Sequence, residues 1–156
     1  MKLINITLVL LTGLCTMKVL SQDTNQWGEP VSGVQLSISS SNSVLSTGST
    51  MILQCRVRNF STNDVFFTLS DTRAMFEVSL ISDSGKSYEL NNPASQDATY
   101  NLPYKLTPGK TYESVLPLQV YKNIELGHYK LQATQNVRIQ DERHKLVSNL
   151  LNIQIK

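Results

Sequence analysis

Hydrophobic and polar residues alternate along most of the chain after Gly33, and this alternation has a period of two. It is clearest over residues 34–38 and 53–57, where each apolar residue is followed by a polar one. An extended strand with this pattern turns one face toward a protein core and the other toward solvent. Because no segment has a convincing helical period, the pattern predicts an all-β protein.

Further short segments of strand-like composition follow as far as the C-terminus. They cover residues 65–69, 76–81, 86–90, 111–121, 128–134, 137–140 and 146–155, with a brief apolar segment at 44–45 ahead of them. Short strands at this spacing are typical of two packed sheets. We therefore predict an immunoglobulin-like antiparallel β-sandwich of about seven to nine strands.

The breaks between these segments carry turn-forming residues. Residues 83–86 predict a hairpin turn with Gly85 at positive φ, and residues 107–110 predict a second tight turn. Both turns are expected to join antiparallel strands. The charged residues 141–145 are expected to form the tip of a further hairpin.

The longest irregular stretch covers residues 91–106 and contains Pro93 and Pro103. We expect it to cross from one sheet to the other. Long loops in compact domains are usually functional or disordered, and proline restricts the backbone. The stretch is therefore the segment in which we expect a partner to be recognised.

The first residues have the pattern of an export signal. Lys2 precedes an apolar run over residues 3–15 that is too short to span a bilayer, and residues 19–21 fit a signal-peptidase site. This predicts a signal peptide at 1–21, an N-terminal lead-in at 22–32 and one β-sandwich domain at 33–156. The mature chain is expected to be secreted or periplasmic and to have no stable membrane span. A retained anchor, or a lipoprotein modified at Cys15, are the alternatives.

Charge argues against two classes of partner. Removing Lys2 and Lys18 with the signal leaves 12 basic residues against 12 acidic ones, and no run of basic residues is present. Nucleic-acid binding requires a surplus of Lys and Arg gathered on one face, so we expect no nucleic-acid partner. Binding to an anionic membrane surface is unexpected for the same reason.

The residues that could carry chemistry are few and scattered. Cys55 would be the only thiol of the mature chain, and it shares a face with apolar Leu53 and Val57, so we expect a buried, inert side chain. His128 and His144 have no companion ligands at metal-binding spacing. We therefore expect no catalytic residue, no metal and no cofactor, and we predict that the protein is not an enzyme.

Several motifs resemble those of the BsuPI-type intracellular proteinase inhibitor domain and related bacterial immunoglobulin-like modules. They are a strand ending in Asn at 53–59, the strand and turn at 76–86, the Pro-Gly turn at 106–110 and a Gly-x-Tyr strand entry at 127–131. The resemblance implies a β-sandwich fold and, by the family name, proteinase inhibition. It assigns no inhibitory residue, because no inhibitory loop can be matched residue by residue.

Three aromatic residues lie outside the expected strands and are candidate partner-binding residues: Trp27, Tyr100 and Tyr104. Their other interpretation is packing at the ends and rim of the sandwich. The Asn59-Phe60-Ser61 sequence fits the N-glycosylation pattern, and the alternative is that the Asn59 side chain caps the junction between strand and turn.

These observations favour a secreted, non-catalytic binding module whose protein or glycan partner is unknown. Two alternatives stay open. One is a proteinase inhibitor. The other is a structural component of a cell-envelope or surface assembly, which would present an apolar edge strand for pairing, with residues 146–155 as the candidate edge.

Overall fold

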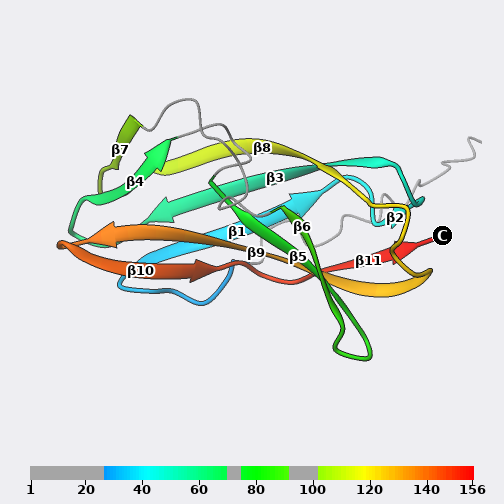
Figure 1. Ribbon diagram of the computed structural model, residues 1–156. Coiled ribbons are helices and arrows are strands. Elements are labelled where there is room, and N and C mark those ends of the chain that lie inside the picture. Colours follow the sequence, from blue (N-terminus) through cyan, green and yellow to red (C-terminus); the bar gives the residue numbers. More distant parts are fainter. Residues whose placement is uncertain (1–26, 70–74, 92–101) are drawn as a thin grey trace, which may run out of the picture.

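The computed structural model describes residues 27–69, 75–91 and 102–156 (Figure 1). These residues form β-strands and no helix, so none of them forms a helix that could cross a membrane. The strands are β1 (Val34–Ser40), β2 (Val44–Leu45), β3 (Thr50–Asn59), β4 (Val65–Leu69), β5 (Glu77–Ser82), β6 (Ser87–Asn91), β7 (Leu102–Leu106), β8 (Thr111–Gln119), β9 (Gly127–Ile139), β10 (Glu142–Val147) and β11 (Leu151–Ile155). The predicted all-β sandwich is confirmed, with eleven strands rather than seven to nine.

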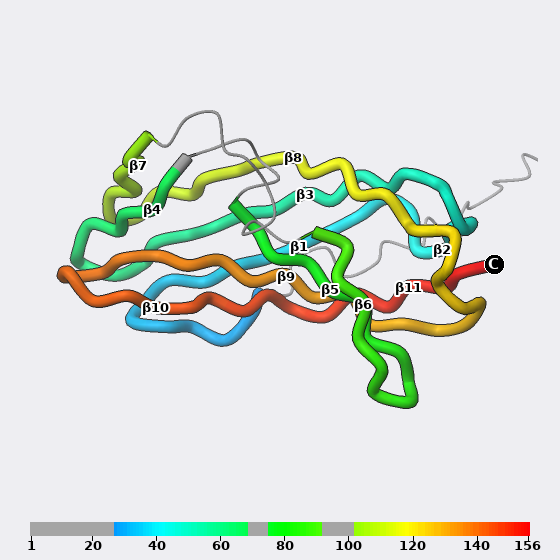
Figure 2. The backbone as a smooth tube through the Cα atoms, in the orientation of Figure 1, coloured from blue at the N-terminus to red at the C-terminus, as the bar shows by residue number. Residues whose placement is uncertain are grey.

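The strands form two sheets that pack as a sandwich (Figure 2). The smaller sheet has the order β1-β3-β8 and is antiparallel throughout. The larger sheet is built around β9, which pairs with β10 and β11 along one edge and with β4 and β5 along the other. The short β2 adds to β11 in parallel, which is an exception to the antiparallel pairing that the sequence predicts.

The core lies between the inner faces of the two sheets and follows the alternation seen in the sequence along β3. In β1 the alternation fails, because Gln35 and Ser37, which were expected to face solvent, are also buried. In β3, every second residue from Met51 to Asn59 is buried, and the residues between them are exposed or half-buried. The largest fully buried side chains are Phe76, Leu36, Ile38, Met51, Leu53, Leu80, Leu106, Leu116, Leu118, Leu131, Leu146 and Ile155. Each buried apolar side chain of this size contributes about 2 kcal/mol to folding, so this contact between sheets is the main source of stability.

Two of the predicted hairpins are confirmed. Gly85 has φ +83° in the turn between β5 and β6. The second turn, between β9 and β10, consists only of Gln140 and Asp141, whose φ values are +49° and +66°. Positive φ at both central residues is typical of the tight type I′ turn. The charged tip expected at 141–145 is therefore mostly strand.

The crossing between sheets occurs at a different place from the one expected. The turn at 107–110 joins β7 of the larger sheet to β8 of the smaller sheet, so it does not connect a paired hairpin. The expected crossover at 91–106 begins and ends in one sheet, because Asn91 closes β6 and residues 102–106 form β7. Its remaining part, residues 92–101, lies outside the described residues.

The edge strand expected at 146–155 is also corrected. Residues 148–150 separate β10 from β11, and β11 lies between β2 and β9 rather than at an edge. Strands β7 and β8 do end their sheets, and each contains a proline, Pro103 and Pro117. Proline has no N–H to donate and is tolerated at sheet edges, where it discourages pairing with another chain.

Candidate binding groove

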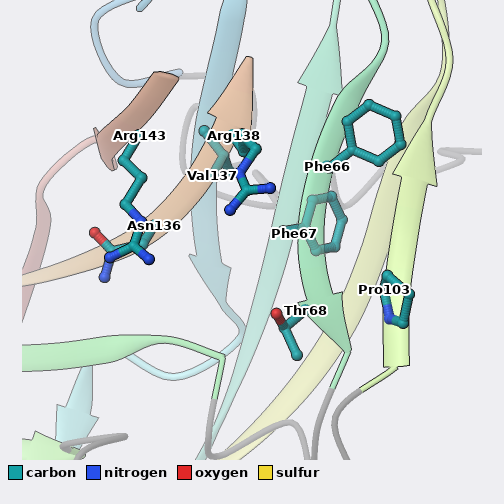
Figure 3. Close-up of a pocket in the computed structure, with 8 residues that line it drawn as sticks. All are labelled: Phe66, Phe67, Thr68, Pro103, Asn136, Val137, Arg138 and Arg143. Carbon is teal, nitrogen blue, oxygen red and sulfur yellow. The ribbon is translucent and has the colours of Figure 1, made fainter. Parts of the chain in front are cut away.

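A groove opens on the outer face of the larger sheet where β4 separates from β9 (Figure 3). β4 pairs with β9 only at Val65 and Phe66, and β5 takes over the same edge from Thr134. In these ladders, residues 135–137 of β9 have no partner on this side. The groove has a volume of about 460 Å³ and is lined by Phe66, Phe67, Thr68, Pro103, Asn136, Val137, Arg138 and Arg143.

Strand alternation determines which side chains face the groove. Val137 and Phe67 point inward and are buried, so they form its floor. The residues next to them in the sequence point outward. The register of the strands places four outward-facing residues in one row across four strands. The row is Arg143 on β10, Arg138 on β9, Phe66 on β4 and Lys105 on β7.

The two arginines are directly opposite each other because the turn between their strands has only two residues. Arg138 and Arg143 stand at equal distances from Gln140 and Asp141, and they are register partners in the β9–β10 ladder. Like charges placed opposite one another on neighbouring strands are destabilising. The repulsion between these two exposed side chains is therefore unfavourable, and a bound anion would reduce it.

Two carboxylates near the groove form ion pairs with lysines rather than with the arginines. Asp64 accepts from Lys105 at 3.0 Å, and Glu77 accepts from Lys145 at 2.7 Å. The ammonium of Lys145, followed by the hydroxyl of Thr134, holds the pKa of Glu77 below its ordinary value. Within the described part of the chain, neither Arg138 nor Arg143 forms an ion pair and no carboxylate lines the groove.

The opposite wall is apolar. Phe66 is 41% exposed although it is a large aromatic residue, and Pro103 is exposed beside it. Asn136 adds an exposed amide on the arginine side. A guanidinium pair facing an apolar wall can bind an anion that carries aliphatic or aromatic surface. Among the residues that the structure describes, the lining contains no His, Cys, Asp or Glu that could serve as a general base.

Trp27 lies on the other sheet and is engaged within the molecule. Its half-buried ring stacks on the guanidinium of Arg58, 4.2 Å from the ring centroid, with Arg56 at 5.2 Å. Arg58 in turn donates from Nε to Oε1 of Gln35 at 2.8 Å. Trp27 therefore packs on the outer face of the smaller sheet and does not reach the groove.

The residue after Trp27 joins the two sheets. Gly28 donates its N–H to Leu36 O at 2.9 Å and accepts from Gln35 Nε2 at 2.7 Å. A Cβ atom on Gly28 would lie 1.8 Å from the carbonyl oxygen of Val147 on β10. Only glycine allows this approach, so the described part of the lead-in, which begins at Trp27, is held in the seam between β1 and β10.

Of the two candidate tyrosines, only Tyr104 lies among the described residues. Tyr104 does not lie outside the strands as expected. It belongs to β7, is half-buried, and packs against the rings of Phe67 and Tyr112 with centroid distances of 5.1 and 5.2 Å. This position agrees with the alternative interpretation of Tyr104, in which the ring packs at the rim of the sandwich. Tyr100 lies outside the described residues.

Asn59 is only 1% exposed, and its side chain forms hydrogen bonds at both ends. Nδ2 donates to the carbonyl oxygens of Asn63 at 2.8 Å and Leu106 at 2.9 Å. Oδ1 accepts from the Ser61 N–H at 3.0 Å and the Ser61 hydroxyl at 2.7 Å. The expected cap between strand and turn is confirmed, whereas a glycan on Nδ2 would have to displace both donated bonds in the folded protein.

Cys55 is fully buried in β3, the central strand of the smaller sheet. Burial raises the pKa of its thiol to about 12, so at pH 8 the reactive thiolate is nearly absent. We expect a water-soluble thiol reagent to modify the native protein at least about a hundredfold more slowly than the denatured protein. Equal rates in the two states would show that the side chain is accessible.

Comparisons with known proteins reveal the fold and not a family. No protein-family model matches the chain, and no curated protein sequence matches it. The resemblance to BsuPI-type domains therefore gains no support from a family match.

Several solved structures are similar in shape. Spo0M, a sporulation control protein from Bacillus subtilis, has a TM-score of 0.51 at 8% identity, over 81% of this chain and 50% of its own. A β-glucosidase from Listeria innocua has a TM-score of 0.43 at 14% identity, over 82% of this chain and 16% of its own. AvmM, described as catalysing macrocyclization in alchivemycin A biosynthesis, has a TM-score of 0.46 at 11% identity, over 80% and 89%. This chain spans half the length of Spo0M, and the likeness to it concerns the β-sandwich fold alone.

Of the residues that line the groove, only Pro103 is singled out by the sequence pattern, and the three with most of the binding chemistry, Phe66, Arg138 and Arg143, are not. The available signal was the type of turn between β9 and β10. Recognising a two-residue turn at 140–141 would have placed the two arginines opposite each other. The position of Phe66 beside Arg138 depends on the pairing of β4 with β9, which no local pattern reveals.

Proposed function

We propose that this chain is a secreted, non-catalytic binding module whose partner docks in the groove between β4 and β9. The observation that carries the proposal is the opposed pair Arg138 and Arg143, which lines a groove with no carboxylate among its described lining residues and faces the exposed ring of Phe66. Arginine and aromatic side chains contribute most of the affinity at many protein interfaces. The partner therefore presents a negatively charged group together with apolar surface.

Export and the absence of catalysis belong to the same proposal. Support for export comes from the short apolar segment at 3–15, which follows Lys2 and precedes a signal-peptidase site. The described lining of the groove offers no base or thiol nucleophile and favours binding over chemistry. Proteinase inhibition would be one form of such binding, and a panel of extracellular proteases measures it directly.

Site-specific photocrosslinking in the producing cells tests the docking surface. The full-length chain would carry a photoreactive amino acid at Thr68, which lines the groove, or at Gln119, an exposed residue of β8. We expect a defined covalent adduct outside the cytoplasm from position 68 and none from position 119. Arg138→Glu with Arg143→Glu should reduce the adduct at least about tenfold, the scale of a lost charged contact.

The matched control is Lys122→Glu with Lys130→Glu, which changes the net charge equally at exposed positions that do not line the groove. This control should leave the adduct unchanged. An adduct that survives the arginine reversal, or that forms equally from position 119, would overturn the proposed docking surface. Retention of the chain in the cytoplasm would overturn the proposed export.

A further inference from the structure

We infer that the ligand of this groove is an extended acidic peptide, an assignment that rests on the proposed function and specifies its partner. The walls of the groove are two strands, and the residues that face it are spaced along them at alternate positions. Asn136 and Arg138 occupy one wall, and Phe66 and Thr68 occupy the other. Residues two apart on a strand are about 6.8 Å apart. An extended peptide laid along the groove presents its alternate side chains at the same spacing.

The charge of the groove selects acidic side chains. In a hairpin closed by a two-residue turn, Ile139 and Glu142 form the hydrogen-bonded pair next to the turn, so Arg138 and Arg143 form a non-hydrogen-bonded pair. Side chains of such pairs are the closest across an antiparallel ladder. Two guanidinium forks at this distance can each bind a carboxylate in bidentate fashion or share one.

The backbone of β9 distinguishes a peptide from other acidic ligands. Ala133 O accepts from Ser148 N at 2.9 Å, so the main-chain groups of Ala133 and every second residue after it face the β10 side. Those of Thr134, Asn136 and Arg138 face the opposite side. There β5 pairs with Thr134 and β4 pairs with Arg138, while Asn136 has no partner in the described ladders.

A peptide can supply the main-chain partner that Asn136 lacks in the described ladders, as strands added to a sheet do. An acidic oligosaccharide has no repeating amide with which to replace these hydrogen bonds. Side-chain spacing, charge and the gap in the ladder therefore favour a peptide over a glycan.

Fluorescence anisotropy with labelled, end-blocked peptides of about eight residues tests the assignment on the full mature chain. The probe has two glutamates at alternate positions in a threonine-rich background, and its isomer has the same glutamates adjacent. In an extended chain only one of two adjacent side chains can face the groove. We expect the probe to bind at least about tenfold more tightly than the isomer and than its glutamine analogue.

Arg138→Gln and Arg143→Gln should each weaken binding of the probe about tenfold, the scale of a lost charged hydrogen bond. Lys130→Gln, an exposed residue of β9 that does not line the groove, is the matched control and should change it less than about twofold. Hydrogen exchange gives an independent measurement, because bound peptide should slow exchange of the Asn136 amide. An unchanged Asn136 amide would overturn the main-chain pairing.

Equal affinity for the two isomers would overturn the assignment, because charge alone would then explain binding. Tighter, arginine-dependent binding of a sulfated hexasaccharide would overturn it in favour of a glycan. Absence of peptide binding, with the crosslink from position 68 still sensitive to the arginines, would overturn the peptide assignment alone. Loss of that sensitivity would overturn the proposed function as well.

Discussion

Replacing Asn59 by alanine is expected to lower the free energy of unfolding by about 3 kcal/mol, because four hydrogen bonds of one buried side chain are lost together. The carbonyl oxygen of Leu106 would lose this hydrogen bond in a buried environment. The backbone of Asn59 also holds the turn that crosses between sheets, since its carbonyl accepts from Gly109 N at 2.7 Å and its N–H donates to Lys110 O at 2.9 Å. Urea denaturation followed by circular dichroism measures the change.

Two further variants make the test specific. Asn59→Asp keeps an oxygen acceptor for Ser61 but places a carboxylate beside the carbonyls of Asn63 and Leu106, so it should destabilise at neutral pH at least as much as alanine. Asn42→Ala removes an exposed side chain and should change stability by less than about 0.5 kcal/mol. A loss below about 1 kcal/mol for Asn59→Ala would show that the cap is not a main determinant of stability.

Replacing Gly28 by alanine is expected to release the lead-in from its seam and to lower the free energy of unfolding by about 2 kcal/mol, as overpacking of a tight contact does. The added Cβ would overlap the Val147 carbonyl, so the chain must move. Trp27 is the only tryptophan of the protein and therefore reports the movement directly. Its fluorescence emission should shift to longer wavelength as its ring leaves Arg58 and enters water.

Glu29→Ala changes the exposed next residue and serves as the control, with unaltered emission and stability expected. If emission shifts in Gly28→Ala without a loss of stability, the lead-in is a detachable segment and the sandwich holds without it. If neither quantity changes, the close approach of Gly28 to β10 does not exist in solution.

The hydrophobic pattern of the sequence predicted which residues of a strand are buried, because this depends on local alternation. The alternation over 34–38 and 53–57 correctly placed Leu36, Leu53 and Cys55 inside, because a strand with one buried face requires that spacing. The same reasoning missed β7, since Pro103 reads as a loop residue although an edge strand tolerates it. Which sheet each strand joins depends on contacts between distant segments, so the crossing at 107–110 could not be recognised.

The groove could not be predicted for the same physical reason. Arg138 and Arg143 occur in a polar stretch that looks like any solvated strand face, and only the register of the hairpin sets them opposite each other. Trp27 was a candidate contact residue because it lies outside the expected strands, with packing at the end of the sandwich as the other interpretation. Its actual neighbours, Arg56 and Arg58, lie about thirty positions along the chain.

The central place of β9 has a consequence for how the chain folds. Strands β4, β5, β10 and β11 all pair with it, yet it comprises residues 127–139 of a chain of 156. The edges of β4 and β5 that pair with β9 have no partner strand until β9 has been synthesised. The larger sheet therefore cannot be completed before the ribosome has passed residue 139. Pairings between such distant segments close slowly, typically in milliseconds to seconds. Truncations that end before residue 127 are therefore expected to yield aggregation-prone chains rather than a smaller folded unit.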